Sequence, residues 1–237
     1  MKAIILNSGI GKRMGSLTKD MPKCLVQINE ETILGFQLKA FIENGIHNII
    51  ITTGPFEYKI KDYIKKHFPE LNVEYVNNQK YASTNYIYSV FLTKDLIDDD
   101  IILIHGDMVF EKSVLKKLIE SEVENSVLIN NKIKPPKKDF KGKIENGLVK
   151  KIGVNVFGEN CFFLAPIYKF SKNTFKLWLN EIENFVKRNE VNVYAENAFN
   201  IISEKIKLKP VYFRDEFCIE VDDLDDLEIA KRFFNNK

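Results

Sequence analysis

A stretch of glycines and cations near the amino terminus constrains this chain more than any other feature. The segment Leu6–Leu25 reads LNSGIGKRMGSLTKDMPKCL and follows the apolar run Ala3–Leu6. Closely spaced glycines let a backbone turn through positive φ and approach a ligand closely, so successive N–H groups can face one anion. Because Lys12, Arg13 and Lys23 lie in the same segment, we expect it to bind a polyphosphate. The alternative is a solvated loop after a strand, which has no need of glycine, arginine and Pro-Lys together.

Two common phosphate-binding motifs do not fit this segment. A Walker loop requires GxxxxGK[ST], and no register supplies it. A dinucleotide fingerprint requires GxGxxG, but Met14 occupies the third glycine position and Gly15 comes one residue late. An NAD-dependent oxidoreductase is therefore disfavoured.

The segment resembles the signature of nucleotidyltransferases related to sugar-1-phosphate nucleotidylyltransferases, in which a strand leads into LAAGxGxRMxxxTxxxPKxL. The positions that match are Leu6, Gly9, Gly11, Arg13, Met14, Thr18, Pro22, Lys23 and Leu25. Asn7-Ser8 stands where the family usually has two alanines, which we expect to alter contacts near the base or the ribose.

The resemblance also implies roles for single residues. Arg13 and Lys23 are the expected catalytic residues: Arg13 would bind the β- and γ-phosphates, and Lys23 would lie over the α-phosphate and the incoming oxygen. The expected nucleotide-binding residues are Leu6, Asn7, Gly9, Gly11, Lys12, Arg13, Lys23, Asn78, Ser83 and Thr84. For Ser83 and Thr84 the alternative is an ordinary helix N-cap.

The composition of the chain limits the class of protein and the kinds of partner that it can bind. Of 237 residues, 45% are hydrophobic, and 35 Lys and Arg against 33 Asp and Glu give a net charge of +2 without a basic block. We therefore expect a soluble globular protein that binds no nucleic acid. Cys24, Cys161 and Cys218 form no CxxC, which argues for reduced thiols in the cytoplasm. No signal peptide or membrane-spanning run is expected.

Apolar strand patterns alternate with helical patterns in the first half of the chain. Strands are expected at Ala3–Leu6, 49–53, 73–76, 101–104 and 126–129, and helices at 33–44, 57–68, 84–92 and 112–118. This order predicts an α/β, Rossmann-like, mostly parallel doubly wound sheet. We expect one domain over residues 1–237, with a nucleotide-binding half at 1–130 and an acceptor-binding half with the second metal ligand at 131–237.

The second half breaks the alternation. Asn146-Gly147 predicts a type I′ turn in a β-hairpin over 140–152, followed by a strand at 161–164 and a helix at 174–186 whose aromatic stripe suits a core. Val211–Phe213 and Phe217–Val221 are expected to pair with each other before a helix at 224–234. The hairpin and the helices would form an acceptor lid.

Two carboxylates follow strands in distant parts of the chain. Asp107 follows the strand at 101–104, and Asp222 follows the run Phe217–Val221. Mg²⁺ prefers oxygen ligands and keeps water and substrate phosphates in its shell. In the family that the chain resembles, matching aspartates carry the metal, so the resemblance implies Mg²⁺ on Asp107 and Asp222. The alternatives are a turn residue at Asp107 and a helix cap at Asp222. His105 is expected to be a packed strand-end residue.

The pattern over Asn77–Leu92 resembles small bacterial cytidylyltransferases for phosphocholine, aminoalkylphosphonates or phosphoglutamine, and this resemblance implies CTP. Val193–Asn197 resembles their acceptor segment, so Tyr194, Glu196 and Asn197 are the expected acceptor-binding residues, with a helix cap as the alternative. Which of Lys141, Lys143 and Lys150 meets the acceptor phosphate is left open.

The expected activity is transfer of CMP from CTP to a small amine-bearing phosphate or phosphonate with release of pyrophosphate, for decorating a surface polysaccharide. The rivals are a sugar-1-phosphate uridylyl- or thymidylyltransferase and a catalytically idle nucleotide sensor. Pairing into a homodimer, the number of metals and the exact acceptor are left open.

Overall fold

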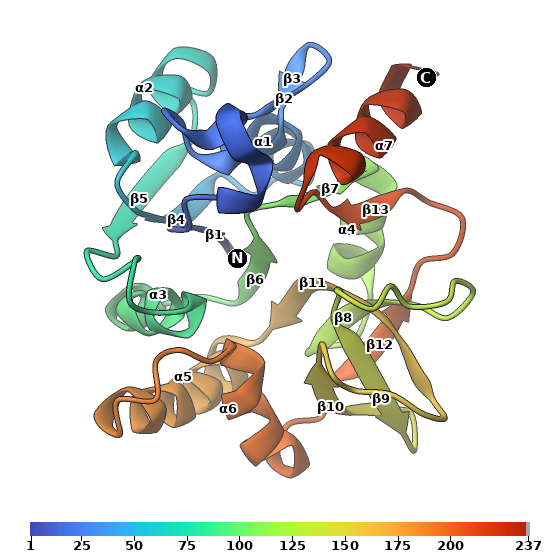
Figure 1. Cartoon of the computed structure of the whole chain (residues 1–237). Helices are drawn as coiled ribbons and strands as arrows, with labels where there is room; N and C mark the ends of the chain where they lie inside the picture. The colour runs from blue at the N-terminus through green and yellow to red at the C-terminus, as the bar shows by residue number, and fades with distance from the viewer. Residues whose placement is uncertain (236–237) are drawn as a thin grey trace.

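The amino-terminal strand lies at the centre of a nine-stranded sheet (Figure 1). In this computed structural model, which describes residues 1–235, β1 (Lys2–Asn7) runs parallel to β4 (Asn48–Thr53) and to β6 (Ile101–His105). β5 (Asn72–Asn77) continues the parallel set beside β4. The predicted α/β fold with a parallel core is confirmed.

The second half of the chain makes the sheet mixed. β11 (Cys161–Phe170) is antiparallel to β6, β8 (Ser126–Asn130) and β9 (Lys141–Glu145). β9 pairs with β10 (Leu148–Gly153) as the predicted hairpin, and Asn146 and Gly147 have φ values of 50° and 73°, as a type I′ turn requires.

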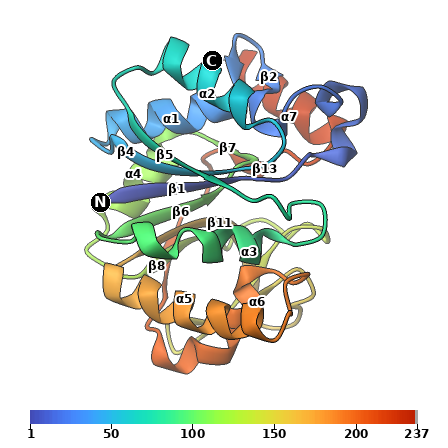
Figure 2. The same ribbon diagram turned by 90° about the vertical axis from the view of Figure 1, so that its left-hand side faces the viewer.

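Helices cover both faces of the sheet (Figure 2). One face carries α1 (Ile33–Glu43), α2 (Glu57–His67) and α4 (Lys112–Glu120). The other carries α3 (Tyr86–Leu92), α5 (Lys172–Lys187) and α6 (Ala195–Ile202). Both faces need cover because successive side chains of a strand point to opposite faces of the sheet. Ala3 and Ile5 pack on the first face, whereas Ile4 packs on the second.

The predicted pairing of the last two strands is wrong. β12 (Lys209–Tyr212) runs parallel to β8 in the main sheet, whereas β13 (Cys218–Glu220) pairs with β7 (Met108–Phe110) in a separate antiparallel pair. The chain between them therefore changes sheets, which local sequence patterns do not reveal. β7 itself, and the short pair β2 (Gln27–Ile28) and β3 (Glu31–Thr32), were not predicted.

The β7–β13 pair brings the end of the chain to the carboxyl ends of the parallel strands. α7 (Leu224–Asn235) follows β13 and packs in a third apolar cluster, where Leu227 and Ala230 meet Met14 and Val26. The residues that follow β6 and β13 are thereby held together with the glycine-rich segment Leu6–Leu25. Among residues 1–235, no helix is both long and apolar enough to cross a membrane.

Candidate active site

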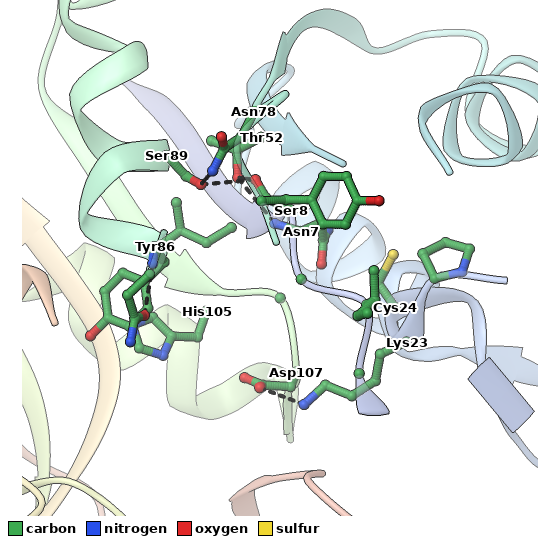
Figure 3. A pocket seen from close by; sticks show the side chains of 18 of the residues that line it. Asn7, Ser8, Lys23, Cys24, Thr52, Asn78, Tyr86, Ser89, His105 and Asp107 are labelled. Atoms are coloured by element: carbon green, nitrogen blue, oxygen red, sulfur yellow. Dashed lines mark hydrogen bonds and ion pairs between the residues drawn. The ribbon is translucent and has the colours of Figure 1, made fainter. Parts of the chain in front are cut away.

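A cavity of about 450 Å³ opens where β1, β4 and β6 end, as expected for a doubly wound sheet. Its wall contains most of the predicted nucleotide-binding residues (Figure 3). The predicted residues that line it are Leu6, Asn7, Gly9, Gly11, Lys12, Arg13, Lys23, Asn78, Thr84 and Asp107. Ser83 does not line the cavity; it is exposed, and its hydroxyl donates to the Lys80 carbonyl.

The glycine-rich loop folds back onto the segment that carries Lys23. Gly11 has a φ of 64°, a left-handed conformation that glycine adopts without strain. A Cβ at Gly11 would lie 2.9 Å from the Cβ of Lys23. The Thr18 hydroxyl donates to the Gly11 carbonyl at 2.9 Å and holds the returning chain. Glycine at position 11 therefore allows both the turn and the close approach of the loop to the segment that carries Lys23.

Four predicted residues form one charged cluster at the cavity. The Lys23 ammonium lies 2.7 Å from Oδ2 of Asp107 and 3.1 Å from Oδ1 of Asp222. The Arg13 guanidinium lies 2.7 Å from the same Asp222 oxygen. Segments far apart in the sequence, after β1, β6 and β13, thus meet at one point.

Burial and the attraction between opposite charges shift the pKa values of Lys23 and Asp107 in opposite directions. Burial works to lower the pKa of Lys23, but the carboxylates of Asp107 and Asp222 outweigh it and raise that pKa. Burial likewise works to raise the pKa of Asp107, and the Lys23 charge with its hydrogen bond outweighs it and lowers that pKa. The pairing therefore favours the ionised forms of both Lys23 and Asp107 despite their burial.

A chain of hydrogen bonds, not expected from the sequence, lines the side of the cavity near α3. The Asn78 amide donates to the hydroxyls of Thr84 at 3.1 Å and Ser89 at 3.0 Å. Ser89 donates to Ser8, and Ser8 donates to Thr52, each at 3.0 Å. These hydrogen bonds hold the side chains of Asn78 and Ser8 in one orientation. Ser8 is one of the two departures from the family pattern, and this departure could have indicated the hydrogen-bond chain from the sequence.

Helix α3 begins at Tyr86, because the Asn85 side chain accepts from the Tyr86 N–H and serves as N-cap. The alternative of an N-cap at Ser83 or Thr84 is therefore wrong. Thr84 instead accepts from Asn78, donates to the Lys80 carbonyl and lines the cavity.

The three predicted acceptor-binding residues lie behind or beside the cavity lining. Glu196 is 1% exposed and accepts hydrogen bonds from the hydroxyls of Tyr168, at 2.8 Å, and of Tyr86. Tyr194 stacks on Tyr86 with ring centroids 5.8 Å apart, and Asn197 is exposed. None of the three lines the cavity; Tyr86, His105 and Asn192 do.

Sequence reasoning missed two acids near Asp222. Burial raises the pKa of Glu220 well above its ordinary value, and the charges of Asp107, Asp139 and Asp222 raise it further. Burial also raises the pKa of Asp139 to about 6. The alternation of a strand was an available signal for Glu220, because it puts residues 220 and 222 on the same side of the chain.

The hairpin lysines have other partners. Lys141 is buried and donates to the carbonyls of Lys137 and Val154, each at 2.8 Å. Lys143 pairs with Glu145 at 2.6 Å, and Lys150 pairs with Glu204 at 2.7 Å. None of the three lysines lines the cavity.

Known proteins resemble this chain in sequence and in fold. A CTP:phosphoglutamine cytidylyltransferase from Campylobacter jejuni is 27% identical over 257 aligned positions, covering 97% of this chain and 98% of that protein. A choline-phosphate cytidylyltransferase from Streptococcus pneumoniae is 34% identical over 121 positions, 51% of each protein. The structure of an inositol-1-phosphate CTP transferase from T. maritima superposes with a TM-score of 0.80 at 21% identity, covering 98% of this chain and 95% of that one.

The family model for nucleotidyl transferases matches residues 2–151, which is more than half of the chain. The match includes the glycine-rich segment, Lys23 and Asp107, which the structure brings to one cavity. The chain belongs to the nucleotidyl transferase family.

Proposed function

We propose that this nucleotidyltransferase transfers CMP from CTP to a small metabolite that carries a phosphate or phosphonate and an amine. The observation that carries the proposal is the cluster of Arg13, Lys23, Asp107 and Asp222, of which the first three line the cavity. The choice of CTP rests on the two relatives, which are cytidylyltransferases by name.

The acids of the site fit a divalent cation. Asp107 and Asp222 present carboxylate oxygens to one point, where Lys23 now bridges them. The other oxygen of Asp107 is buried and accepts no hydrogen bond from residues 1–235, so it has capacity for a further ligand. Hard oxygen donors of this kind suit Mg²⁺. When bound, Mg²⁺ would supply charge neutralisation on the phosphates.

The reaction needs positioning more than it needs a base. An anionic oxygen of the acceptor attacks the α-phosphorus of CTP, a new P–O bond forms, and the bond to pyrophosphate breaks. Because the nucleophile is already ionised, no serine, cysteine or histidine has to activate it. Lys23 would stabilise the charge on the α-phosphate, and Arg13 would hold the leaving phosphates through its planar fork of donors.

We assign selection of the nucleotide base to the side of the cavity that contains Asn78 and Thr84. Hydrogen bonds from Asn78 to Thr84 and Ser89 hold this wall in one arrangement. A fixed set of amide and hydroxyl groups can distinguish the donor and acceptor edge of cytosine from that of uracil. Decoration of a surface polysaccharide remains a prediction from the resemblance.

A pyrophosphate-release screen tests the proposal. The four ribonucleoside triphosphates and dTTP would be combined with Mg²⁺ and with phosphocholine, phosphoethanolamine, 2-aminoethylphosphonate, phosphoglutamine and glucose 1-phosphate. We expect pyrophosphate with CTP and a nitrogen-bearing acceptor, and none from Asp107→Asn. Release with UTP or dTTP and the sugar phosphate would establish the sugar nucleotidyltransferase rival. CTP binding without pyrophosphate from any acceptor would establish the idle sensor.

A further inference from the structure

Gln37 is a fully buried polar residue on an otherwise apolar face of α1. Its side chain is 0% exposed, and its helix neighbours Leu38 and Phe41 belong to the apolar cluster that covers one face of the sheet. Nε2 of Gln37 donates to the carbonyl of Met108 at 2.8 Å and to that of His105 at 3.1 Å. Both N–H groups of the amide therefore go to backbone carbonyls of the segment that joins β6 to β7.

The same side chain carries an atom that has no partner. Oε1 of Gln37 is buried and accepts no hydrogen bond from residues 1–235. Reversing the amide would not remove this deficit, because an oxygen would then face two carbonyl oxygens. A buried acceptor without a partner costs stability, and an apolar side chain of similar size would avoid that cost. Residues that break such a rule are expected chiefly at functional sites.

The segment that Gln37 holds carries Asp107. The two carbonyls belong to the residues on either side of Gly106-Asp107. Two backbone contacts hold the same segment, since the Gly106 N–H donates to the Leu6 carbonyl at 3.1 Å and the Val221 N–H donates to the Asp107 carbonyl at 3.0 Å. A Cβ at Gly106 would lie 2.5 Å from the carbonyl oxygen of Leu6, so the segment packs closely against β1.

These contacts decide where the Asp107 carboxylate points. Its Oδ2 pairs with Lys23 at 2.7 Å (Figure 3), and its Oδ1 is buried and accepts no hydrogen bond from residues 1–235. The contacts from β1 and β13 are made by backbone atoms, which most substitutions leave in place. The contact from α1 is made by a side chain, so a substitution of Gln37 would release the segment on that side.

We propose that Gln37 is a positioning residue for the divalent-cation site, because it fixes the backbone that presents Asp107. The inference rests on the proposed function, in which Asp107 is a metal ligand. Gln37 does not line the cavity, so it acts through the two carbonyls that it holds. Removing a group that orients a metal ligand typically lowers metal affinity or activity by about 10- to 100-fold.

The experiment measures how much Mg²⁺ strengthens the binding of CTP. Calorimetry on the full-length protein, without any acceptor, would give the Kd of CTP in EDTA and in Mg²⁺. The ratio of the first Kd to the second is the gain from the metal, and it does not depend on turnover. This ratio would be compared among wild type, Gln37→Met and Gln37→Glu.

Ile64→Ala is the matched control. Ile64 is buried in the same apolar cluster but belongs to α2, so its truncation weakens the fold without removing a hydrogen bond from the segment at Asp107. Urea unfolding would establish that this control is no more stable than Gln37→Met. A comparison of the two variants therefore separates positioning from general stability.

We expect Gln37→Met to lower the ratio by about 10- to 100-fold while the Kd of CTP in EDTA stays within about twofold. Gln37→Glu should lose less, because its carboxyl can donate one hydrogen bond when it is protonated. Ile64→Ala should keep the wild-type ratio.

A wild-type ratio in Gln37→Met would overturn the inference and leave the proposed function intact. An equal loss in Ile64→Ala would also overturn it, since general weakening of the fold would then explain the effect. If wild type gained nothing from Mg²⁺, both the inference and the metal site of the proposed function would be rejected. The expected ratios together with a failed pyrophosphate-release screen would support the inference and reject the proposed acceptors.

Discussion

At the scale of single residues, Lys23 is the residue on which the proposed chemistry most depends. Its ammonium bridges two carboxylates that lie more than a hundred residues apart in the chain, Asp107 and Asp222. The same amine would have to leave at least one of them to contact the α-phosphate. A cation that exchanges between protein carboxylates and substrate contributes more to the transition state than to ground-state binding.

We therefore expect Lys23→Ala to lower kcat by about 100- to 1,000-fold while the Kd of CTP rises less than tenfold. Single-turnover kinetics and calorimetry with CTP measure the two quantities. Lys39→Ala, which removes an exposed lysine paired with Glu31, is the matched control and should leave both unchanged. An unchanged kcat in Lys23→Ala would remove the lysine from the chemical step.

Asp139 makes stability depend on pH. Burial raises its pKa from 3.8 to about 6, with Lys138 opposing and Asp226 and Asp222 adding to the rise. The folded state therefore binds more protons than the unfolded state between these values, so stability falls as pH rises from about 4 to about 6. Above that window the ionised carboxylate destabilises the fold.

Asp139→Asn should stabilise the ligand-free protein by on the order of 1 kcal/mol at pH 8 and by little at pH 4. Urea unfolding at several pH values in EDTA measures the difference. Glu70→Gln, at an exposed position, should follow wild type throughout. Equal effects of Asp139→Asn at pH 4 and pH 8 would show that burial of the charge is not the cause.

At the scale of elements, the loop between β8 and β9 is tied to the start of α7. Lys138 lies 2.6 Å from Oδ2 of Asp226 and 3.0 Å from Oδ2 of Asp223. The same Asp226 oxygen accepts from the backbone N–H groups of Asp222 and Asp223. The next residue of the loop, Asp139, lies near Glu220, and Phe140 packs edge-on against the rings of His105 and Tyr194. The loop therefore holds the backbone of Asp222 in place.

Lys138→Met should raise the Mg²⁺ concentration for half-maximal activity about three- to fivefold, with the CTP KM nearly unchanged. The effect is modest because a half-exposed ion pair contributes about 1 kcal/mol or less. Lys138→Arg should restore the wild-type Mg²⁺ dependence. Lys132→Met is the control, since Lys132 lies on the same loop and pairs with Asp215. A loss equal in both methionine variants would indicate general loosening of the loop.

At the scale of the whole molecule, β11 joins the two halves of the chain. Residues 167–170 of β11 pair with β6, and residues 163–169 pair with β8, both of which belong to the first half. Residues 161–163 pair with β9 of the second half. Trp178 and Phe199 of the second half share one apolar cluster with Ile4 and Ile50 of the first. We therefore propose that residues 1–237 form a single cooperative domain.

Unfolding tests this proposal. Trp178, the only tryptophan in the sequence, reports on the second half, whereas far-UV circular dichroism reports on all helices and strands. We expect both signals to change in one coincident transition in urea. Two separated midpoints would divide the chain into independently folding units.

Much of the first half could be predicted from sequence, because its signals are local. Apolar runs with β-branched residues define β1, β4 and β6, and α1, α2 and α4 lie close to the predicted helices. In the second half, the strand predicted at 161–164 is too short. The structure continues β11 to Phe170 and places Pro166 at a register shift between Ala165 and Tyr168, where a missing N–H is tolerated.

By itself, the sequence determined the glycine-rich segment, the parallel α/β core and the residue types suited to a triphosphate, because spacing along the chain carries that information. Only the tertiary structure decided that Arg13 and Lys23 meet Asp107 and Asp222, that β13 pairs with β7, and that Glu220 and His105 have buried atoms without a hydrogen-bond partner in residues 1–235. The physical reason is that convergence of distant strand ends, and the satisfaction of each buried polar atom, depend on contacts that local sequence patterns do not encode.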